Sequence, residues 1–411
     1  MRNARHWLGL MVVCLVVTSA ASVLAQDWPQ WRGAGRDGKV KDFVAPATWP
    51  ATLTQVWKVA LGTTDSTPAL VGDKLYTYSR EGDQETVSCL GAADGKILWQ
   101  DKNAAPAIGG PSARQHGGPR CAPAVAEGKV VVVGIAGVIS CLNAADGKLL
   151  WRKDPFPGVT PMFFTASSPL ITDGMAIAYL GGPGQGALVA WDLTTGEEKW
   201  RWGAEGPDYG SPTLATIEGV KQIVTLTEKS LVGVAVADGK LLWQVAFATA
   251  RMAYNAATPI VDGNTVIYSG KGRGTFAVKV AKQGDAFAAT QLWANADVGV
   301  QFSSPVLQDG LLFGLSDRGN LFCLNAETGK LGWSDAVQRD RGGFGPVVAA
   351  GPAIFCLPSS GQLTAFKADG AEYAQLAQYK VSEGLVFGHP IIAGNRVFVQ
   401  DQASVALWTM P

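Results

Sequence analysis

Histidine and cysteine are the residue types most directly associated with metal and nucleophilic chemistry, and both are sparse in this chain. Beyond residue 25 there are two histidines, His116 and His389, and five cysteines, with no CxxC pair and no two cysteines adjacent. Structural zinc sites need four such ligands, usually at short fixed spacings. We therefore expect no metal site and no disulfide framework. The sequence also has no G-x-S-x-G motif, and its many Asp-Gly pairs are explained as turns.

Arginines and aromatic residues gather instead in short stretches between apolar runs. The longest of these, from Gln100 to Arg120, is predicted to be a loop, and loops of this length often have a function. The candidate ligand or partner residues of these stretches are Arg114, His116, Arg120, Tyr209, Arg251, Tyr254, Asn255, Gln301, Arg339, Arg341, Phe344 and His389, with Phe302, Asp340, Glu383 and Phe387 beside them. Such a surface suits a protein partner or an anionic small molecule. The alternative is that the aromatic residues only cover the ends of the core.

A recurring phrase indicates that the chain is built from repeats. Five copies end in a tryptophan that follows a glycine by four residues, as in CLNAADGKLLW at Trp151 and CLNAETGKLGW at Trp333. A weaker copy ends at Trp293, another has Tyr379 in the tryptophan place, and a lone strand near the N-terminus carries Trp57. The full set lies at intervals of 40 to 52 residues and comprises Trp57, Trp99, Trp151, Trp200, Trp243, Trp293, Trp333 and Tyr379. This period predicts one four-stranded blade per repeat.

The two ends of the chain predict how the repeats close into a ring. The last repeat ends at Pro411 after three strands, whereas the Trp57 strand lacks the three strands that should precede it. Joining them removes the exposed edges of an open sheet. We therefore predict an all-β, eight-bladed propeller over residues 54–411, closed by the N-terminal strand and preceded by an extension over residues 26–53.

The tryptophans are predicted to be wedges between blades. The residue ten positions before each of the five clearest tryptophans is Cys, Ala or Gly, and we expect this small side chain to form the wall that faces the indole. Cys89, Cys141 and Cys323 occupy this position, so we interpret them as structural residues.

Residues 1–25 are interpreted as a signal peptide. Arg2 and Arg5 precede an apolar run over residues 8–17, and residues 23–25 form a small-residue cleavage pattern. Cys14 lacks the small preceding residue that lipidation requires. No later run approaches the roughly 20 apolar residues of a membrane span. We expect a periplasmic or secreted protein with no span after cleavage, the alternative being an uncleaved anchor.

The overall charge argues against nucleic acid as a partner. The 34 basic residues equal the 34 acidic ones in number, so no polybasic field is available to bind phosphate backbones. We expect a monomer whose partner is a protein or another cell-envelope component.

Two segments resemble a known family. AWDLTTGEEKW, which contains Ala190, Asp192, Thr195, Gly196 and Trp200, resembles the tryptophan-docking motif of quinoprotein alcohol dehydrogenases and their non-enzymatic relatives. DWPQWRGAGRDG, which follows the signal peptide, resembles the start of bacterial PQQ-binding-like β-propeller repeat proteins. The resemblance covers nearly all of the chain after residue 25. It implies the fold more specifically than an activity, because the docking motif serves blade packing.

This family has two branches that imply different functions. Its quinoprotein dehydrogenases hold pyrroloquinoline quinone and Ca²⁺ in the axial funnel, typically with a disulfide between adjacent cysteines, which this chain lacks along with their long insertions. The branch similar to the outer-membrane assembly scaffold BamB uses the same ring as a protein-binding platform without a cofactor.

We accordingly predict a scaffold that has no cofactor and no catalysis of its own, and that binds its partner through the funnel face. The alternative is a quinoprotein-type oxidoreductase acting on an alcohol or sugar, in which Arg120, Arg251 or Arg341 would bind the cofactor carboxylates. Binding of a sugar or a polyanion is a third possibility.

Overall fold

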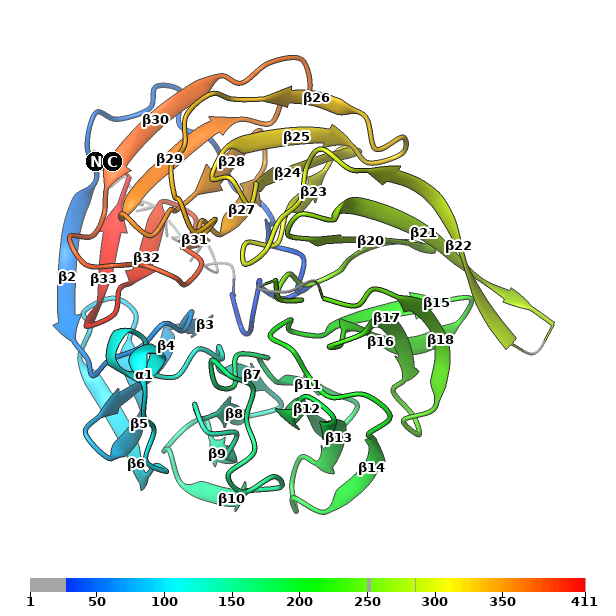
Figure 1. Ribbon diagram of the computed structural model, residues 1–411. Helices are drawn as coiled ribbons and strands as arrows, with labels where there is room; N and C mark the ends of the chain where they lie inside the picture. Colours follow the sequence, from blue (N-terminus) through cyan, green and yellow to red (C-terminus); the bar gives the residue numbers. More distant parts are fainter. Residues whose placement is uncertain (1–26, 250–252, 285, 411) are drawn as a thin grey trace, which may run out of the picture.

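The chain forms a ring of eight sheets around a central axis, as the computed structural model shows (Figure 1). The structure describes residues 27–249, 253–284 and 286–410. Each sheet contains a blade of four antiparallel strands, with the first strand beside the axis and the fourth at the rim, and the sheet of blade 7 gains β1 (Lys39–Val40) as a fifth, parallel strand. The predicted eight-bladed propeller is thereby confirmed. The predicted signal peptide, residues 1–25, lies outside the described residues.

The strands follow one another blade by blade. Blades 1 to 4 comprise β3 (Ala69–Val71), β4 (Lys74–Glu81), β5 (Gln84–Gly91) and β6 (Ile97–Ala104); β7 (Ala124–Ala126), β8 (Lys129–Val133), β9 (Ile139–Asn143) and β10 (Leu149–Lys153); β11 (Leu170–Thr172), β12 (Met175–Gly182), β13 (Gln185–Asp192) and β14 (Glu198–Trp202); and β15 (Thr213–Ile217), β16 (Val220–Leu226), β17 (Ser230–Ala235) and β18 (Leu241–Ala246). Blades 5 to 8 comprise β19 (Ile260–Asp262), β20 (Thr265–Gly270), β21 (Gly274–Gln283) and β22 (Ala286–Asn295); β23 (Val306–Gln308), β24 (Leu311–Leu315), β25 (Leu321–Asn325) and β26 (Leu331–Ser334); β27 (Val347–Ala350), β28 (Ala353–Cys356), β29 (Gln362–Lys367) and β30 (Gln375–Lys380); and β31 (Ile391–Ala393), β32 (Arg396–Gln400), β33 (Ser404–Thr409) and β2 (Thr54–Ala60).

The ring closes through the two ends of the chain, as predicted. Strand β2 pairs antiparallel with β33, with Trp57 opposite Leu407, and completes blade 8 as its fourth strand. The closure buries residues from both ends in one apolar cluster, including Val405 and Leu407. No described blade is therefore left incomplete.

Six rim tryptophans pack against the next blade around the ring, five of them on a turn glycine; the sixth, Trp333, donates from Nε1 to the carbonyl of Asp369 at 2.8 Å and packs against Tyr373. The indoles of Trp57, Trp99, Trp151, Trp200 and Trp293 lie against Gly95, Gly147, Gly196, Gly239 and Gly329, respectively, in the turn between the third and fourth strands of that blade. Each indole Nε1 also donates to a main-chain carbonyl of the neighbouring blade, at 2.9–3.3 Å. All five glycines have positive φ, and a Cβ on any of them would overlap the ring, so these turns require glycine.

For Trp99, Trp151 and Trp200, the wall that faces the indole differs from the one that the sequence suggested. The small residue ten positions earlier pairs directly with the tryptophan across two adjacent strands of the same blade, as Cys89 does with Trp99. It makes room for the indole within the blade, while the turn glycine forms the wall on the next blade.

Blade 7 has no docking tryptophan. Ala365 pairs with Ala377 where the equivalent pair of blade 6 is Cys323 with Trp333, and Tyr379 pairs with Leu363 two residues further on. The structure therefore places Ala377, and not Tyr379, at the tryptophan position. The reason is topological: the third and fourth strands of blade 8 are the two ends of the chain, so no turn between them offers a glycine.

Trp243 is a second exception. Its Nε1 donates to Gln222 Oε1 within its own blade, at 2.7 Å. The next blade joins β21 to β22 by a long hairpin instead of the short glycine turn, and this hairpin extends beyond the ring in Figure 1.

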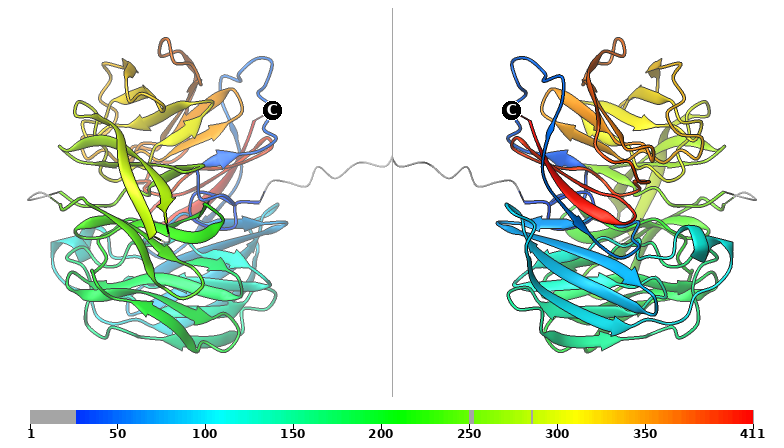
Figure 2. Two further views of the ribbon diagram at one scale, coloured as in Figure 1. Left: turned by 90° about the vertical axis from the view of Figure 1, so that its right-hand side faces the viewer. Right: turned by 90° about the vertical axis from the view of Figure 1, so that its left-hand side faces the viewer.

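The N-terminal extension is folded into the axis of the ring. Residues 27–40, which we call the plug, contact every blade at or within two residues of its first strand: at Leu70, Val125, Pro169, Pro212, Thr258, Pro305, Ala349 and His389. The last two plug residues form β1 (Lys39–Val40), which runs parallel to β27. Figure 2 shows this N-terminal segment at the opposite end of the axis from the short helix α1 (Pro111–Gln115).

Two buried arginines hold the plug in place. Arg32 donates to the carbonyls of Ser304 and Pro305, at 2.8 and 2.6 Å. Arg36 donates to the carbonyls of Pro212 and Pro169, at 2.7 and 2.9 Å. Burial lowers the pKa of Arg36 to about 9 and that of Arg32 to about 10. The plug is thus fixed by main-chain oxygens from several blades.

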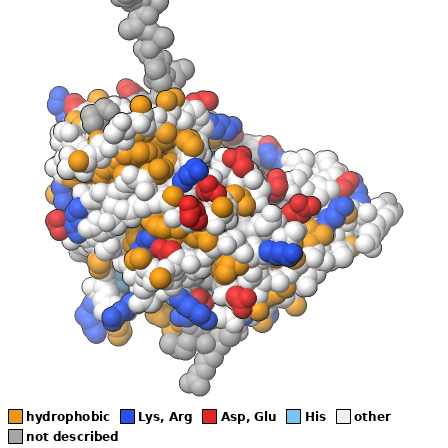
Figure 3. Space-filling view, turned by 90° about the horizontal axis from the view of Figure 1, so that it is seen from above, with side chains coloured by type: hydrophobic (Ala, Val, Ile, Leu, Met, Phe, Trp, Pro, Cys, Tyr) orange, Lys and Arg blue, Asp and Glu red, His pale blue; other side chains and the backbone are white. Residues whose placement is uncertain are grey.

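The outer surface carries charges of both signs. In the edge-on view of Figure 3, lysines and arginines lie among aspartates, glutamates and apolar side chains, without a field of one sign on that face. In the part of the chain that the structure describes, no helix is both long and apolar enough to cross a membrane.

Candidate functional site: an aromatic funnel on the axis

A cavity of about 410 Å³ opens on the axis and is lined mainly by the connections between successive blades. Each connection from the fourth strand of one blade to the first strand of the next contributes a residue: Asp65, His116, Phe163, Tyr209, Tyr254, Phe302, Phe344 and Phe387. We call this cavity the aromatic funnel. Six of these eight residues are phenylalanine or tyrosine, because six of the connections carry an aromatic residue shortly before the first strand of the next blade.

The rings of the funnel pack against one another. Phe302 and Phe344 stack with their centroids 4.2 Å apart, and the Phe387 ring meets Phe344 edge-on at 5.1 Å. On the other side, the Tyr254 ring lies edge-on to Phe163 and to Tyr209, at 5.3 and 5.4 Å. Such contacts stabilise the rings in fixed positions and leave a preformed apolar surface.

The plug contributes to the lining of the funnel through Trp31. Its Nε1 donates to Thr258 Oγ1 at 2.8 Å, and its ring lies edge-on to His389, with centroids 4.7 Å apart. The plug contacts all eight blades, and its Trp31 lines the funnel. We therefore interpret the plug as the closed end of the funnel.

One sector of the funnel is polar. His116 Nδ1 lies 2.8 Å from Asp65 Oδ2, and Gln402 donates to Asp65 Oδ1 at 2.8 Å. Arg120 donates to the carbonyl of His116 at 3.0 Å, while its buried Nη1 has no partner among the described residues. Burial lowers the pKa of Arg120, and the nearby Asp65 opposes that shift. This sector suits a polar or anionic end on an otherwise apolar ligand.

The remaining polar groups of the funnel are occupied or buried. The Tyr209 hydroxyl accepts a hydrogen bond from the amide of Phe163 at 3.1 Å, and burial raises its pKa to about 12. All five described cysteines are free, buried and outside the lining, and burial raises the pKa of each thiol. Neither Tyr209 nor the cysteines provide an ionised group at neutral pH.

The structure brings together five of the residues selected from the sequence: His116, Arg120, Tyr209, Tyr254 and Phe344 line the funnel. Phe302 and Phe387, which flank the selected residues, line it as well. Trp31, Asp65 and Phe163 were missed. Phe163 precedes a strand opening in the same way as the others, so its place in the repeat was the available signal.

Three other selected residues are buried beneath the funnel face. Asn255 donates to the carbonyls of Thr227 and Phe247, which makes it part of the framework. Gln301 is buried as well. His389 is 3% exposed and lies against the plug, and burial lowers its pKa well below the usual value, so it is a neutral ring at physiological pH.

The other selected arginines do not reach the funnel. Arg339 pairs with Asp335 and donates to the Tyr373 hydroxyl at 3.0 Å. Arg341 is exposed, and Arg114 lines a different cavity. Arg251 lies outside the described residues. The stretch from Gln100 to Arg120 is also more regular than predicted, because β6 continues to Ala104 and α1 follows.

Comparisons of the sequence identify its relatives. The family model described as outer membrane protein assembly factor BamB matches residues 41–116 and 83–335. BamB of Yersinia pestis is 23% identical over 330 residues, which cover 77% of this chain and 68% of that protein. A tetrathionate hydrolase of Acidithiobacillus ferrooxidans is 27% identical over 177 residues, 40% of this chain and 33% of the hydrolase. Quinohemoprotein alcohol dehydrogenase ADH-IIG of Pseudomonas putida is 26% identical over 147 residues, 34% of this chain and 19% of the enzyme.

Solved structures share the fold. BamB from Moraxella catarrhalis superimposes with a TM-score of 0.66 and 16% identity, covering 88% of this chain and 98% of that one. Quinohemoprotein alcohol dehydrogenase from Comamonas testosteroni gives a TM-score of 0.68 and 16% identity, covering 94% and 81%. The family model, in contrast, matches well over half of the sequence itself. The chain therefore belongs to the family described as outer membrane protein assembly factor BamB.

Proposed function

We propose that this protein is an exported binding scaffold that holds a polypeptide partner in the aromatic funnel. The observation that carries the proposal is the ring of six aromatic side chains, contributed by six consecutive blade connections around one pocket. A pocket of about 410 Å³ has the size of a small-ligand site and can accept one or two large side chains. Protein interfaces concentrate their binding energy in such buried apolar pockets.

The polar sector and the relatives agree with a polypeptide partner. Arg120 and the His116–Asp65 pair lie at one side of the apolar rings, where they can meet a main-chain or acidic group of the partner. The relatives named BamB are described as outer membrane protein assembly factors, which supports a partner in the cell envelope. We propose a periplasmic or secreted monomer, in keeping with the predicted signal peptide.

Quinone-dependent oxidation of an alcohol or sugar is the alternative, and similarity to quinohemoprotein alcohol dehydrogenases favours it. The residues of the funnel do not fit pyrroloquinoline quinone with Ca²⁺. The lining has one carboxylate, Asp65, which already meets His116 and Gln402, whereas Ca²⁺ takes six to eight oxygen ligands. Among the described residues, no group of three or more His, Cys, Asp or Glu side chains is placed to hold a metal ion.

Titration with pyrroloquinoline quinone and Ca²⁺, followed by dye reduction with simple alcohols and sugars, separates the two functions. The scaffold proposal predicts neither saturable binding nor turnover. Saturable binding accompanied by turnover would establish the oxidoreductase and refute the scaffold.

Selection of a displayed random peptide library on the purified protein tests the scaffold directly. We expect enriched peptides that share a large apolar anchor, and loss of the enrichment with Phe344→Asp, which places a charge in the apolar wall. Phe287→Asp, the same substitution on β22 outside the funnel, is the matched control and should keep it. If the same peptides bind Phe344→Asp as well as wild type, the funnel is not the binding site.

A further inference from the structure

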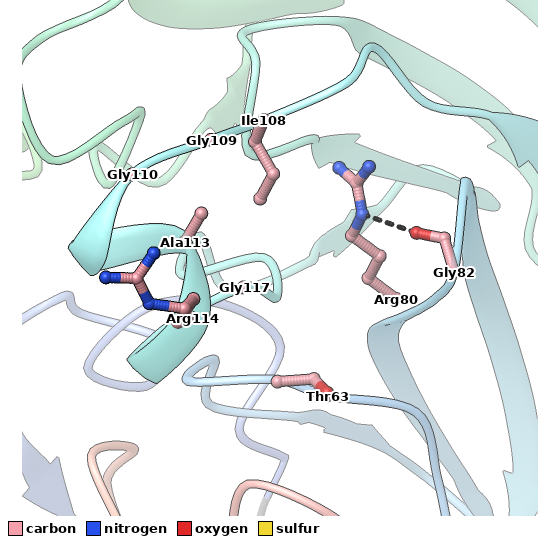
Figure 4. A pocket seen from close by; sticks show the side chains of 9 residues that line it. All are labelled: Thr63, Arg80, Gly82, Ile108, Gly109, Gly110, Ala113, Arg114 and Gly117. Atoms are coloured by element: carbon pink, nitrogen blue, oxygen red, sulfur yellow. Dashed lines mark hydrogen bonds between the residues drawn. The ribbon is translucent and has the colours of Figure 1, made fainter.

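A second cavity, of about 480 Å³, is lined in part by α1, which also lines the funnel. Figure 4 shows the residues of this second cavity. Ser112 and Gln115 of α1 line the funnel, whereas Ala113 and Arg114 line the second cavity, so the helix is a wall shared by both. The remaining lining residues of the second cavity are Thr63, Arg80, Gly82, Ile108, Gly109, Gly110 and Gly117. This lining contains two arginines and no acidic residue.

Arg80 is the buried charge of the second cavity. Its main chain is fixed by two hydrogen bonds with Thr63, at 2.7 and 2.9 Å. Its Nε donates to the carbonyl of Gly82 at 3.0 Å and one Nη to that of Pro106 at 3.1 Å. The residue is 8% exposed. The guanidinium is therefore held in one orientation before any ligand arrives.

The other Nη of Arg80 has no hydrogen-bond partner, and the charge has no counter-ion. Nη1 is buried without an acceptor, and no carboxylate of the described residues lies within 4.0 Å of the side chain. A buried guanidinium without an anion is costly, and a carboxylate that accepts from it removes most of that cost. The charge is therefore uncompensated, and an acceptor reaches Nη1 only after neighbouring side chains of the lining move aside.

We propose that this cavity binds the carboxylate of an organic acid or of a peptide terminus, with Arg80 as its anchor. One guanidinium balances one negative charge, and Ile108 and Ala113 offer apolar surface to the rest of the ligand. A phosphate dianion would keep an uncompensated charge beside these apolar groups. The site is separate from the funnel, so it stands or falls independently of the scaffold function.

Arg114 is not the anchor. It is exposed, and Figure 4 shows its guanidinium pointing away from that of Arg80, which lies across the cavity beside Ile108. This geometry makes Arg114→Ala a matched control for Arg80→Met, because both variants remove one arginine from the same lining.

Calorimetric titration tests the proposal with N-acetyl-leucine as the carboxylate, N-acetyl-leucinamide as its neutral analogue and inorganic phosphate as the other anion. We expect only N-acetyl-leucine to bind wild type and Arg114→Ala, with binding to Arg80→Met weaker by roughly tenfold or more. Equal binding of the amide, equal binding of phosphate, or unchanged binding to Arg80→Met would each overturn the carboxylate site.

A second variant keeps the proposal testable if Arg80→Met does not fold. Ile108→Glu places a carboxylate of the chain itself next to Arg80, so it should raise the melting temperature and abolish binding of N-acetyl-leucine. Ile108→Gln has nearly the same shape without the charge and should leave the melting temperature lower than that of Ile108→Glu. If the two variants melt alike and both still bind the acid, Arg80 does not anchor a carboxylate there.

Discussion

The contact between Trp151 and Gly196 allows the blade-to-blade packing to be measured as a coupling energy. The Trp151 ring is 7% exposed and donates from Nε1 to the carbonyl of Leu193 at 3.1 Å. Its removal in Trp151→Ala should lower the free energy of unfolding by about 3–5 kcal/mol. A Cβ on Gly196 would lie 2.7 Å from Trp151 Cγ, and φ there is +73°. Gly196→Ala should therefore cost about 1–2 kcal/mol in backbone strain and about 1–3 kcal/mol in overlap.

The double variant distinguishes these two costs. Once the indole is gone the overlap disappears, so the double variant should be more stable than the sum of the single effects predicts, by about 1–3 kcal/mol. Urea unfolding followed by far-ultraviolet circular dichroism measures all four proteins. Gly196→Ala combined with Trp333→Ala, in a distant blade, is the control and should be additive within about 0.5 kcal/mol. Additivity in the Trp151 pair as well would refute the packing of the indole on this glycine.

Three further predictions concern the plug, one buried acid and the chain start. Arg36→Met leaves the carbonyls of Pro169 and Pro212 without donors, so urea unfolding should show a loss of about 3–5 kcal/mol, against almost no change for the exposed control Arg341→Met. Burial raises the pKa of Asp208 from 3.8 to about 6, so the folded state holds this proton more tightly than the unfolded state. The contribution of Asp208 to the free energy of unfolding is therefore greatest below pH 4 and falls as the pH rises towards 6. Between these pH values, the free energy of unfolding of Asp208→Asn should rise relative to that of wild type by up to about 3 kcal/mol, which urea unfolding at a series of pH values measures. Mass spectrometry of the protein recovered from a periplasmic fraction should find Gln26 as the first residue, whereas an intact Met1 would contradict the predicted signal peptide.

The ring architecture was predictable because each blade repeats the same local chemistry. A glycine at positive φ and a tryptophan four residues later recur with one period, and the unmatched strands at the two ends imply their pairing. The docking position of blade 7 was predicted wrongly. The predicted closure already implied that blade 8 has no turn between its third and fourth strands, but Tyr379 was aligned with the tryptophans, whereas the strand register places Ala377 there.

The plug was not predictable because its partners are main-chain atoms. Arg32 and Arg36 resemble any pair of solvated charges in the sequence, and the carbonyls that accept from them belong to prolines and serines of distant blades. Sequence reasoning placed the plug residues in an extension, with no sign that its charges were buried.

The funnel was predictable in part because it draws on one position of each repeat. Aromatic residues just before a strand opening face the axis, which is why Tyr254 and Phe344 were found. Asn255 and Gln301 are the sequence neighbours of the lining residues Tyr254 and Phe302. Because successive side chains along a connection point in different directions, these two side chains are buried in the ring and do not line the funnel. Adjacent residues of a connection therefore differ in role, and sequence position alone does not say which of them faces the pocket.

Photo-crosslinking in intact cells tests the funnel as the binding site most directly. A benzoylphenylalanine in place of Phe302, within the funnel, should give a covalent adduct with a cell-envelope polypeptide. The same group in place of Leu292, on the outer strand β22, should not. Adducts from position 292 with none from position 302 would contradict the account.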